Sequence, residues 1–356
     1  MTRKELIKAI EDKRNSKVLC YVTGDRTAIP PNIPPIPGLT TQMATEPQLL
    51  IYEHLKAIGK VEKLDLFLYT RGGNTNSVWP LVSLIREFCD KFCVLVPFRA
   101  HSAGTMVALG ADEIVMSRIA ELSPIDPTTA NQFNPKIEPQ NQKSPPLGIS
   151  VEDVTSYIKL VREGEPKLKD EKSILAAFEK LATSVHPLAL GNVYRVYAQI
   201  RQLAKNLLEL HMPEGSNTDE IVKFFVEKLY AHDHAINRKE AASVLGDIVK
   251  YEEDEELLMW NLYEDISAEL ELSNPFNVKE FIGNQAEREV SVKGALIESY
   301  TKKHLYKAVL KIIQRSVVPP NLQLQVPPGQ QIPAIIPGLP TAINIDVVSM
   351  GWAEDA

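Results

Sequence analysis

The chain has 356 residues, of which 44% are hydrophobic and 24% are charged, and its formal net charge is −7. This composition is typical of a globular protein with enough apolar material for a core, and it excludes a wholly disordered chain. The acidic balance argues against a basic domain for nucleic acid, and the length predicts about two domains, or one large domain with an appendage.

The sequence also indicates the surroundings in which the protein works. No apolar run reaches about 18 residues, and the N-terminal stretch is charged and amphipathic, unlike the apolar core of a signal peptide. We therefore expect neither a membrane anchor nor a leader. Three cysteines, Cys20, Cys89 and Cys93, are too few for a disulfide framework, which favours a reducing, cytoplasmic location.

The first part of the chain alternates apolar runs with helical spacing, which predicts a mostly parallel sheet with right-handed crossovers. Prolines between 30 and 38 exclude both a strand ladder and a helix, so an extended loop is expected there. The expected elements are a helix over 2–15, a strand over 17–23, a helix over 45–60, and strands over 64–69, 92–97 and 113–116 separated by helices over 77–88 and 102–110.

The rest of the chain is more helical. Residues 131–148 are polar and contain prolines, which predicts a long loop, and 151–272 are mainly helical. Two alternating stretches, 290–297 and 305–313, suit a β-hairpin, although a helix fits the second nearly as well. From Val317 onward the chain is rich in proline and glutamine, which is typical of a tail.

A four-residue sequence occurs twice in the chain. Ile336-Pro337-Gly338-Leu339 in the expected tail repeats Ile36-Pro37-Gly38-Leu39. Proline followed by glycine is turn chemistry, so the same kind of turn used twice is one interpretation. The other is that both segments dock in equivalent grooves on neighbouring subunits.

Two glycines follow the strand expected over 64–69. Gly72 and Gly73 let the backbone approach a ligand closely and direct bare N–H groups at it. Two such donors stabilise the oxyanion that forms during acyl transfer. A tight turn between a strand and a helix also selects glycine, so the pair alone is a weak signal.

A serine follows the next strand. Ser102 lies between this strand and a helix of small residues, where the helix N-terminus favours an anionic intermediate. The stretch Ala100-His101-Ser102-Ala103-Gly104 is one glycine short of the nucleophile elbow G-x-S-x-G, because Ala100 replaces the first glycine. Ser102 is therefore either a nucleophile or an ordinary helix N-cap.

Candidates for proton transfer come later in the chain. Asp126 lies between prolines, which suits either a turn residue or an orienting carboxylate. His232 and Asp233 offer a general base with its carboxylate, or a solvated helix end. His234 follows them, but no further carboxylate–histidine spacing resembles a metal motif. We therefore expect no metal and no cofactor.

Taken in order, the stretches 65–73, 96–105, 111–116 and 123–127 resemble the serine dehydrogenase proteinase family. This family is similar to signal peptide peptidase A and to the proteolytic subunit of Clp protease. The resemblance is dense over 60–130 and resumes weakly near His232. It implies an α/β, crotonase/Clp-protease-like fold with stacked strand–strand–helix units, a helical insertion, and a C-terminal β-hairpin plus tail.

The resemblance implies Ser102 as the nucleophile and Gly72 and Gly73 as the oxyanion hole. It is less clear about the base, because Asp126 holds the place where Clp-type peptidases have a histidine. One solution is a triad of Ser102, His232 and Asp126, with Asp233 as a helper. This chemistry needs an imidazole near neutrality and a carboxylate that orients it.

The competing solution is a Ser–Lys dyad of the signal-peptide-peptidase type. Lys143 lies in the polar loop, and Lys159 lies in an amphipathic helix, where burial would lower its pKa toward that of a base. Either lysine is also an ordinary surface residue by default.

We therefore expect a cytoplasmic serine peptidase that acts on a peptide or protein substrate, forms a homo-oligomer, and has no nucleic acid partner and no membrane anchor. Two other functions stay open: an inactive peptide-binding or scaffold protein, and an acyl-CoA-processing enzyme, which needs no nucleophilic serine. The expected regions are a peptidase core over 1–135 and 225–250, a loop and helical region for the cleft and oligomer contacts over 136–224, a helical and β region over 251–316, and a proline-rich tail over 317–356.

Overall fold

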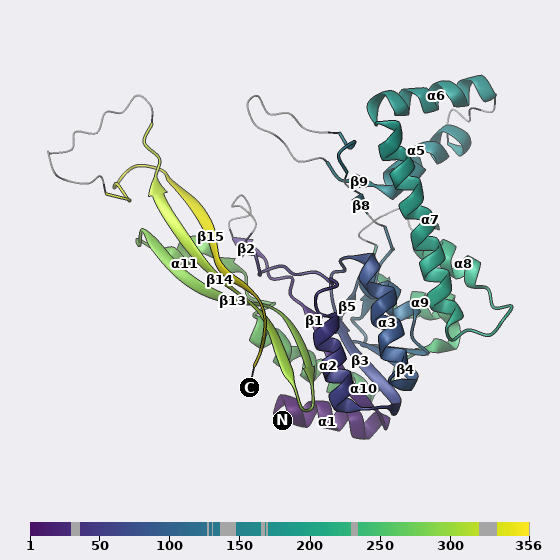
Figure 1. Ribbon diagram of the computed structural model, residues 1–356, viewed down its shortest axis with the longest axis horizontal. Coiled ribbons are helices and arrows are strands. Elements are labelled where there is room, and N and C mark those ends of the chain that lie inside the picture. The colour runs from purple at the N-terminus through teal and green to yellow at the C-terminus, as the bar shows by residue number, and fades with distance from the viewer. Residues whose placement is uncertain are drawn as a thin grey trace.

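The computed structural model describes residues 1–29, 36–126, 128–129, 131–135, 147–164, 168, 170–228, 234–319 and 333–355 (Figure 1). Its centre is an eight-stranded mixed sheet with the order β11-β6-β4-β3-β1-β13-β14-β15. The mixed α/β architecture, together with a helical insertion and a C-terminal hairpin, confirms the expected fold class. No helix in the described ranges combines the length and the apolarity needed to cross a bilayer.

The first five strands in this order run parallel and form the buried half of the sheet. Helices cover both of its faces, so these strands read as continuous apolar runs. The strands are β1 (Lys17–Thr23), β3 (Val61–Tyr69), β4 (Cys89–Val96), β6 (Glu113–Met116) and β11 (Val249–Lys250). One face carries α2 (Gln48–Ile58), α3 (Val78–Arg86), α4 (Ala103–Leu109) and α7 (Pro187–Glu209), and the other carries α1 (Arg3–Arg14) and α10 (Glu253–Leu270).

The other three strands are antiparallel and extend the sheet away from this core (Figure 1). They are β13 (Glu287–Ser299), β14 (Lys303–Ser316) and β15 (Thr341–Glu354). The stretch 305–313, for which a helix was the alternative, is thus part of the strand β14. β15 corrects the expectation of a tail over 317–356. The prolines of this region dominate its average composition, whereas Thr341–Glu354 carries the alternation of a strand.

Shorter elements complete the chain. The helical insertion holds α5 (Val151–Glu163), α6 (Glu171–Ser184), α7, α8 (Thr218–Lys223) and the π-helix η2 (Phe224–Lys228). Paired short strands are β2 (Ala28–Ile29) with β12 (Phe276–Asn277), β8 (Thr128–Thr129) with β9 (Ile149–Ser150), and β5 (Arg99–Ala100), β7 (Glu121–Leu122) and β10 (Ile236–Asn237) in one small sheet. The remaining helices are η1 (Thr75–Ser77), α9 (Arg238–Leu245), η3 (Gly246–Ile248) and α11 (Val278–Ile282).

Two charged clusters anchor the N-terminal helix to the sheet. Arg14, at the end of α1, donates from Nε to Asp65 at 2.7 Å and contacts Glu113 and Glu255, each at 2.7 Å. Its side chain is 3% exposed and that of Asp65 is 0% exposed, so the charges are paired inside the protein. Arg3, at the start of the same helix, joins a second cluster around Glu269 of α10.

Candidate functional site

Ser102 stands at the tight turn between β5 and α4. Its φ is 49° and its ψ is −109°. The other two described non-glycine residues with positive φ, Asn15 and Glu271, are left-handed helix caps, so the conformation of Ser102 is of another kind. A residue held there costs about 1–3 kcal/mol, and such strain clusters at functional sites. A sharp, strained turn from strand to helix is the geometry of a nucleophile elbow, although Ala100 replaces its first glycine.

Hydrogen bonds from the next loop hold this turn. The Ser102 N–H donates to Ser123 Oγ at 2.8 Å, and the Ser123 N–H donates to Thr105 Oγ1 at 3.0 Å. The Thr105 hydroxyl in turn donates to the Ala100 carbonyl at 2.8 Å. Ser123 and Thr105 are therefore positioning residues for Ser102. The sequence contained Ser123 inside the motif singled out for Asp126, but nothing local indicated its partner.

The glycine turn packs directly against Ser102. A Cβ on Gly72 would lie 2.8 Å from the Ser102 Cβ, and a Cβ on Gly73 would lie 2.3 Å from the Met43 carbonyl oxygen. The Met43 N–H donates to the Gly72 carbonyl at 2.8 Å, and the Asn74 N–H donates to the Met43 carbonyl at 2.9 Å. Met43 thus pairs with the turn like a strand. Both glycines are required because neither position has room for a side chain.

The two glycine N–H groups differ. That of Gly72 donates to Thr70 Oγ1 at 3.0 Å. That of Gly73 has no acceptor among the residues that the structure describes. Gly73 therefore offers a backbone donor to a ligand, whereas Gly72 provides clearance for Ser102.

A small sheet brings three segments to this turn. β7 lies between β5 and β10, with Ala100 opposite Leu122 and Leu122 opposite Ile236. The strand leading to Ser102 thus shares this sheet with the strand that follows the histidine-containing segment. His232 and Asp233 themselves lie outside the described residues. Their neighbour His234 contacts Glu240 through Nε2 at 3.0 Å.

The remaining predicted residues have other partners in the structure. The Asp126 carboxylate accepts from the Ser150 hydroxyl at 2.9 Å and from the Glu152 N–H at 3.2 Å, at the start of α5. The Lys159 ammonium group donates to the Glu227 carbonyl in η2 at 3.3 Å. Lys143 lies outside the described residues.

His101, beside the serine, is a titratable group that the sequence did not single out. Its Nε2 is 3.4 Å from Glu121 Oε1. Burial lowers the pKa of His101 to about 4, although the charge of Glu121 opposes this shift. The imidazole is therefore neutral at neutral pH and adds no positive charge beside Ser102.

The chain is also similar to known proteins. Residues 1–163 match the family model of the ClpP-like SDH-type serine proteinases. An uncharacterised protein of Methanocaldococcus jannaschii is 25% identical over 264 residues, which cover 74% of this chain and 79% of the relative. A second uncharacterised protein of the same organism is 28% identical over 127 residues, which cover 36% of this chain and 42% of the relative.

Among solved structures, two mutant forms of a membrane-bound stomatin-specific protease resemble the chain, one of them in complex with a substrate peptide. Each is 17% identical with a TM-score of 0.34, and the likeness covers 61% and 60% of this chain and 79% and 73% of those chains. A TM-score this low adds nothing to the family match, which depends on the sequence.

Proposed function

We propose that this chain, whose residues 1–163 belong to the ClpP-like SDH-type serine proteinases, hydrolyses peptide bonds through an acyl-enzyme on Ser102. The observation that carries the proposal is the strained turn of Ser102, which packs against Gly72 and is held by Ser123. Strain of this kind at a serine between a strand and a helix has no use in an ordinary N-cap, and Ser102 makes no side-chain cap hydrogen bond.

The oxyanion would be held by backbone donors. We assign this role to the N–H of Gly73, which lacks a described acceptor, and to that of Ala103, the residue after the nucleophile. Gly72 would contribute by leaving space for Ser102 and the substrate. Removing one oxyanion donor costs about 10²–10³ in kcat in serine proteases.

For the base, we favour His232, oriented by Asp126 with help from Asp233. The support is that β10, which follows this segment, lies in the same small sheet as β5, which precedes Ser102. The carboxylate of Asp126 is fixed in place by Ser150 and the backbone of α5. A dyad with Lys143 or Lys159 is the alternative, and Lys159 already contacts η2, the helix before this segment.

The steps would then run as in other serine peptidases. The base takes the proton of Ser102 Oγ as this oxygen attacks the peptide carbonyl, and the tetrahedral oxyanion is held by the Gly73 and Ala103 N–H groups. The protonated base gives its proton to the leaving amine, which leaves an acyl-enzyme. Water, deprotonated by the same base, releases the acid and regenerates Ser102.

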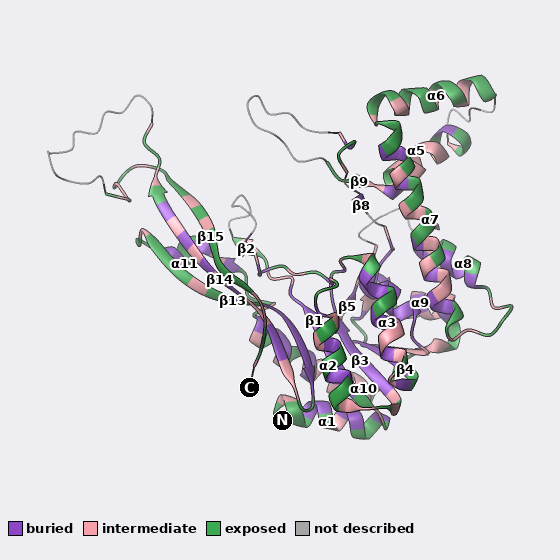
Figure 2. Cartoon of the chain, viewed as in Figure 1, coloured by how far each residue is buried: buried purple, intermediate pink, exposed green. Residues whose placement is uncertain are grey.

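We also infer a cytoplasmic homo-oligomer, with the helical insertion as the contact region. Within the chain α6 buries none of its residues, and its Leu175 and Phe178 are 56% and 48% exposed. Figure 2 shows α6 projecting from the body with an exposed surface. Apolar side chains on such a helix are typical of subunit contacts.

The first experiment is labelling with a fluorophosphonate probe, followed by peptide mass mapping. We expect the label on Ser102, none in Ser102→Ala, and a loss of about 10²–10⁴ in labelling rate in His232→Ala. His186→Ala, which removes an exposed histidine at the start of α7, is the matched control and should label like the wild type.

Two other results would change the proposal. Labelling that survives His232→Ala and disappears in Lys143→Ala or Lys159→Ala, but not in the exposed control Lys172→Ala, would move the base to a lysine. An absence of label at Ser102 under all conditions, with peptides bound equally well by wild type and Ser102→Ala, would make the protein a binding module.

A further inference from the structure

β15 forms the open edge of the eight-stranded sheet. β14 pairs with one side of it from Thr341 to Glu354, and no described residue pairs with the other side. Val347, Val348 and Met350 on this strand are 45%, 55% and 51% exposed. A long edge strand with exposed apolar side chains is a template for a further strand.

Most of the large apolar side chains of β15 share one face. Val347, Met350 and Trp352 lie opposite alternating residues of β14, because the irregularity at Val348 shifts the register by one residue. Asn344 and Asp346 alternate with the apolar positions and lie on the other face. An added strand would therefore meet an apolar face and a polar face.

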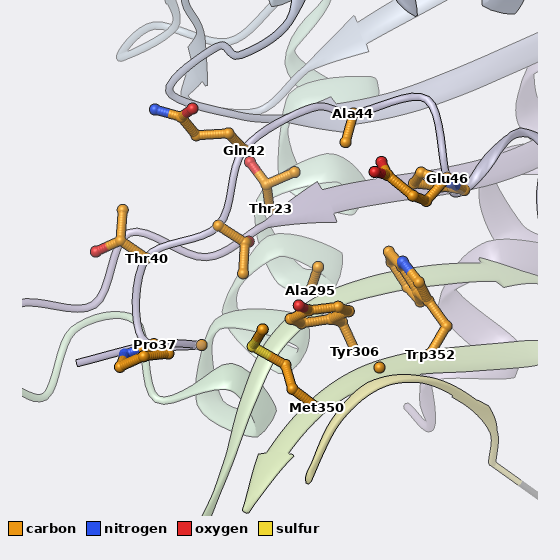
Figure 3. A pocket seen from close by; sticks show the side chains of 14 residues that line it. Thr23, Pro37, Thr40, Gln42, Ala44, Glu46, Ala295, Tyr306, Met350 and Trp352 are labelled. Atoms are coloured by element: carbon orange, nitrogen blue, oxygen red, sulfur yellow. The ribbon is translucent and has the colours of Figure 1, made fainter. Parts of the chain in front are cut away.

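A cavity of about 560 Å³ lies beside this edge on the apolar face. Its volume is in the range of pockets that hold ligands or peptide side chains. The rings of Tyr306 and Trp352 form one wall, with centroids 5.6 Å apart, and Figure 3 shows Ala44 and Glu46 of the loop before α2 opposite them. Met350 lies at the same wall, so the cavity continues the apolar strip of β15.

Carboxylates lie along the edge and in the cavity. Glu354 of β15 is paired with Lys302 at 3.6 Å, whereas no ion pair to a described residue involves Asp346 of β15 or Glu46, which lines the cavity. Lys311, opposite Asp346 on β14, is occupied by an ion pair with Glu287 at 3.0 Å. Two copies of β15 side by side would bring carboxylates of the same sign together, whereas a segment with basic residues would complement them.

We propose that the outer edge of β15 and the adjoining cavity bind an extended apolar peptide segment that carries basic residues. The segment joins the sheet as an added strand, places an apolar side chain between Trp352 and the loop before α2, and sets a basic side chain near Asp346. Main-chain hydrogen bonds give affinity in this mode of recognition, and the pocket gives selectivity. The site does not involve Ser102, so it stands apart from the proposed peptidase chemistry.

The test uses the full chain with Ser102→Ala, so that hydrolysis does not interfere. The probe is a short fluorescein-labelled peptide in which valine alternates with lysine, followed by fluorescence anisotropy. We expect saturable binding that weakens at least about tenfold in Met350→Lys, which places a cation at the apolar cavity wall and repels the lysines of the probe. The control Val318→Lys adds the same charge at a 38% exposed valine outside the edge and the cavity, and should bind like the parent.

Further measurements distinguish the proposed peptide from other partners that could bind the β15 edge. A peptide with aspartate in place of lysine should not bind if the carboxylates of Asp346 and Glu46 select the partner. Unsaturable binding of the lysine peptide by the parent chain, or equal binding by Met350→Lys, would overturn the proposal. Sedimentation velocity completes the set, because an oligomer that dissociates in Met350→Lys would assign the edge to a second copy of the chain.

Discussion

The two halves of the central sheet are supported differently. In the parallel half, helices cover both faces and every residue of β1 after Lys17 is buried. In the antiparallel half, β15 has no buried residue along its length (Figure 2). The strained turn of Ser102 is attached to the half with two-sided support. The antiparallel half instead ends in the open edge of β15. The same sheet therefore carries the turn of Ser102 in one half and an edge strand that can pair with a further strand in the other.

The same contrast recurs in two turns of identical sequence. In Ile36–Leu39 and Ile336–Leu339 the leucine N–H donates to the isoleucine carbonyl, at 3.3 Å and 3.2 Å. Gly38 and Gly338 have φ values of 84° and 86°. The repeat is thus the same turn used twice, as one interpretation of the sequence predicted. Only the first turn is buried, because it packs against β13 and β14.

The largest effect is expected where the parallel half contains paired charges. Arg14→Met leaves the Asp65 carboxylate, which is 0% exposed, without its cation. Breaking a buried pair in this way lowers the free energy of unfolding by about 3–5 kcal/mol. Urea unfolding followed by circular dichroism measures this loss of unfolding free energy. Lys8→Met, which removes an exposed pair on the same helix, should cost less than about 0.5 kcal/mol, and similar losses in the two variants would contradict the expectation.

The buried proline–glycine turn comes next. Gly38→Ala demands a positive φ from alanine and places its Cβ 2.7 Å from the Ala308 Cβ and 3.1 Å from Val292 Cγ2. Strain and overpacking together should lower the free energy of unfolding by about 2–4 kcal/mol. Thermal and urea unfolding both report this loss. A near-neutral result would mean that β14 moves away freely, and would remove the distinction between the two turns.

Acid should weaken the link between α1 and the antiparallel half. Burial raises the pKa of Glu269, but hydrogen bonds from Lys303, Arg3 and Lys293 outweigh it and lower the pKa to about 2. A carboxyl whose folded pKa is depressed stabilises the protein above its unfolded pKa and loses this contribution as pH falls. The free energy of unfolding should therefore fall between about pH 4.5 and 2.

The variant that tests this pH dependence is Glu269→Gln. We expect it to lower the free energy of unfolding by about 1–2 kcal/mol at pH 7 and by little at pH 2, which flattens the acid limb. Glu113→Gln is the matched change in the parallel half, where hydrogen bonds from Lys91 and Arg14 likewise outweigh burial and lower the pKa of Glu113 to about 2. An unchanged pH slope in Glu269→Gln would show that this cluster contributes nothing.

The smallest effect is expected at the exposed copy of the turn. A Cβ on Gly338 meets no atom within 4 Å, so Gly338→Ala has only the positive φ to oppose it. We expect this strain to lower the free energy of unfolding by about 1 kcal/mol, which the same thermal and urea unfolding experiments measure. The two turns have the same sequence, so the difference between the losses of unfolding free energy in Gly38→Ala and Gly338→Ala measures the contribution of burial. A larger loss in Gly338→Ala would reverse the comparison.

Much of the parallel core could be predicted from the sequence alone. Apolar periodicity located the strands at 17–23 and 113–116 with their observed bounds, and it located β3, β4 and the helices α2 and α3 within a few residues. Glycine and serine at the ends of these strands marked the turns that the structure brings together. These features depend on residues near one another in the chain, so local patterns are sufficient to reveal them.

Contacts between distant residues needed the tertiary structure. The sequence did not reveal that Ser123 accepts from the Ser102 N–H, that Met43 pairs with the glycine turn, or that Thr70 occupies the Gly72 N–H. The expectation of a tail hid β15, because the prolines before it dominate the composition of the region, and the sequence did not reveal that Thr341–Glu354 pairs with β14 as the edge of the sheet. Composition and periodicity determine which segments can be strands and turns. Hydrogen-bond partners and burial follow from how those segments are brought side by side, which no local pattern encodes.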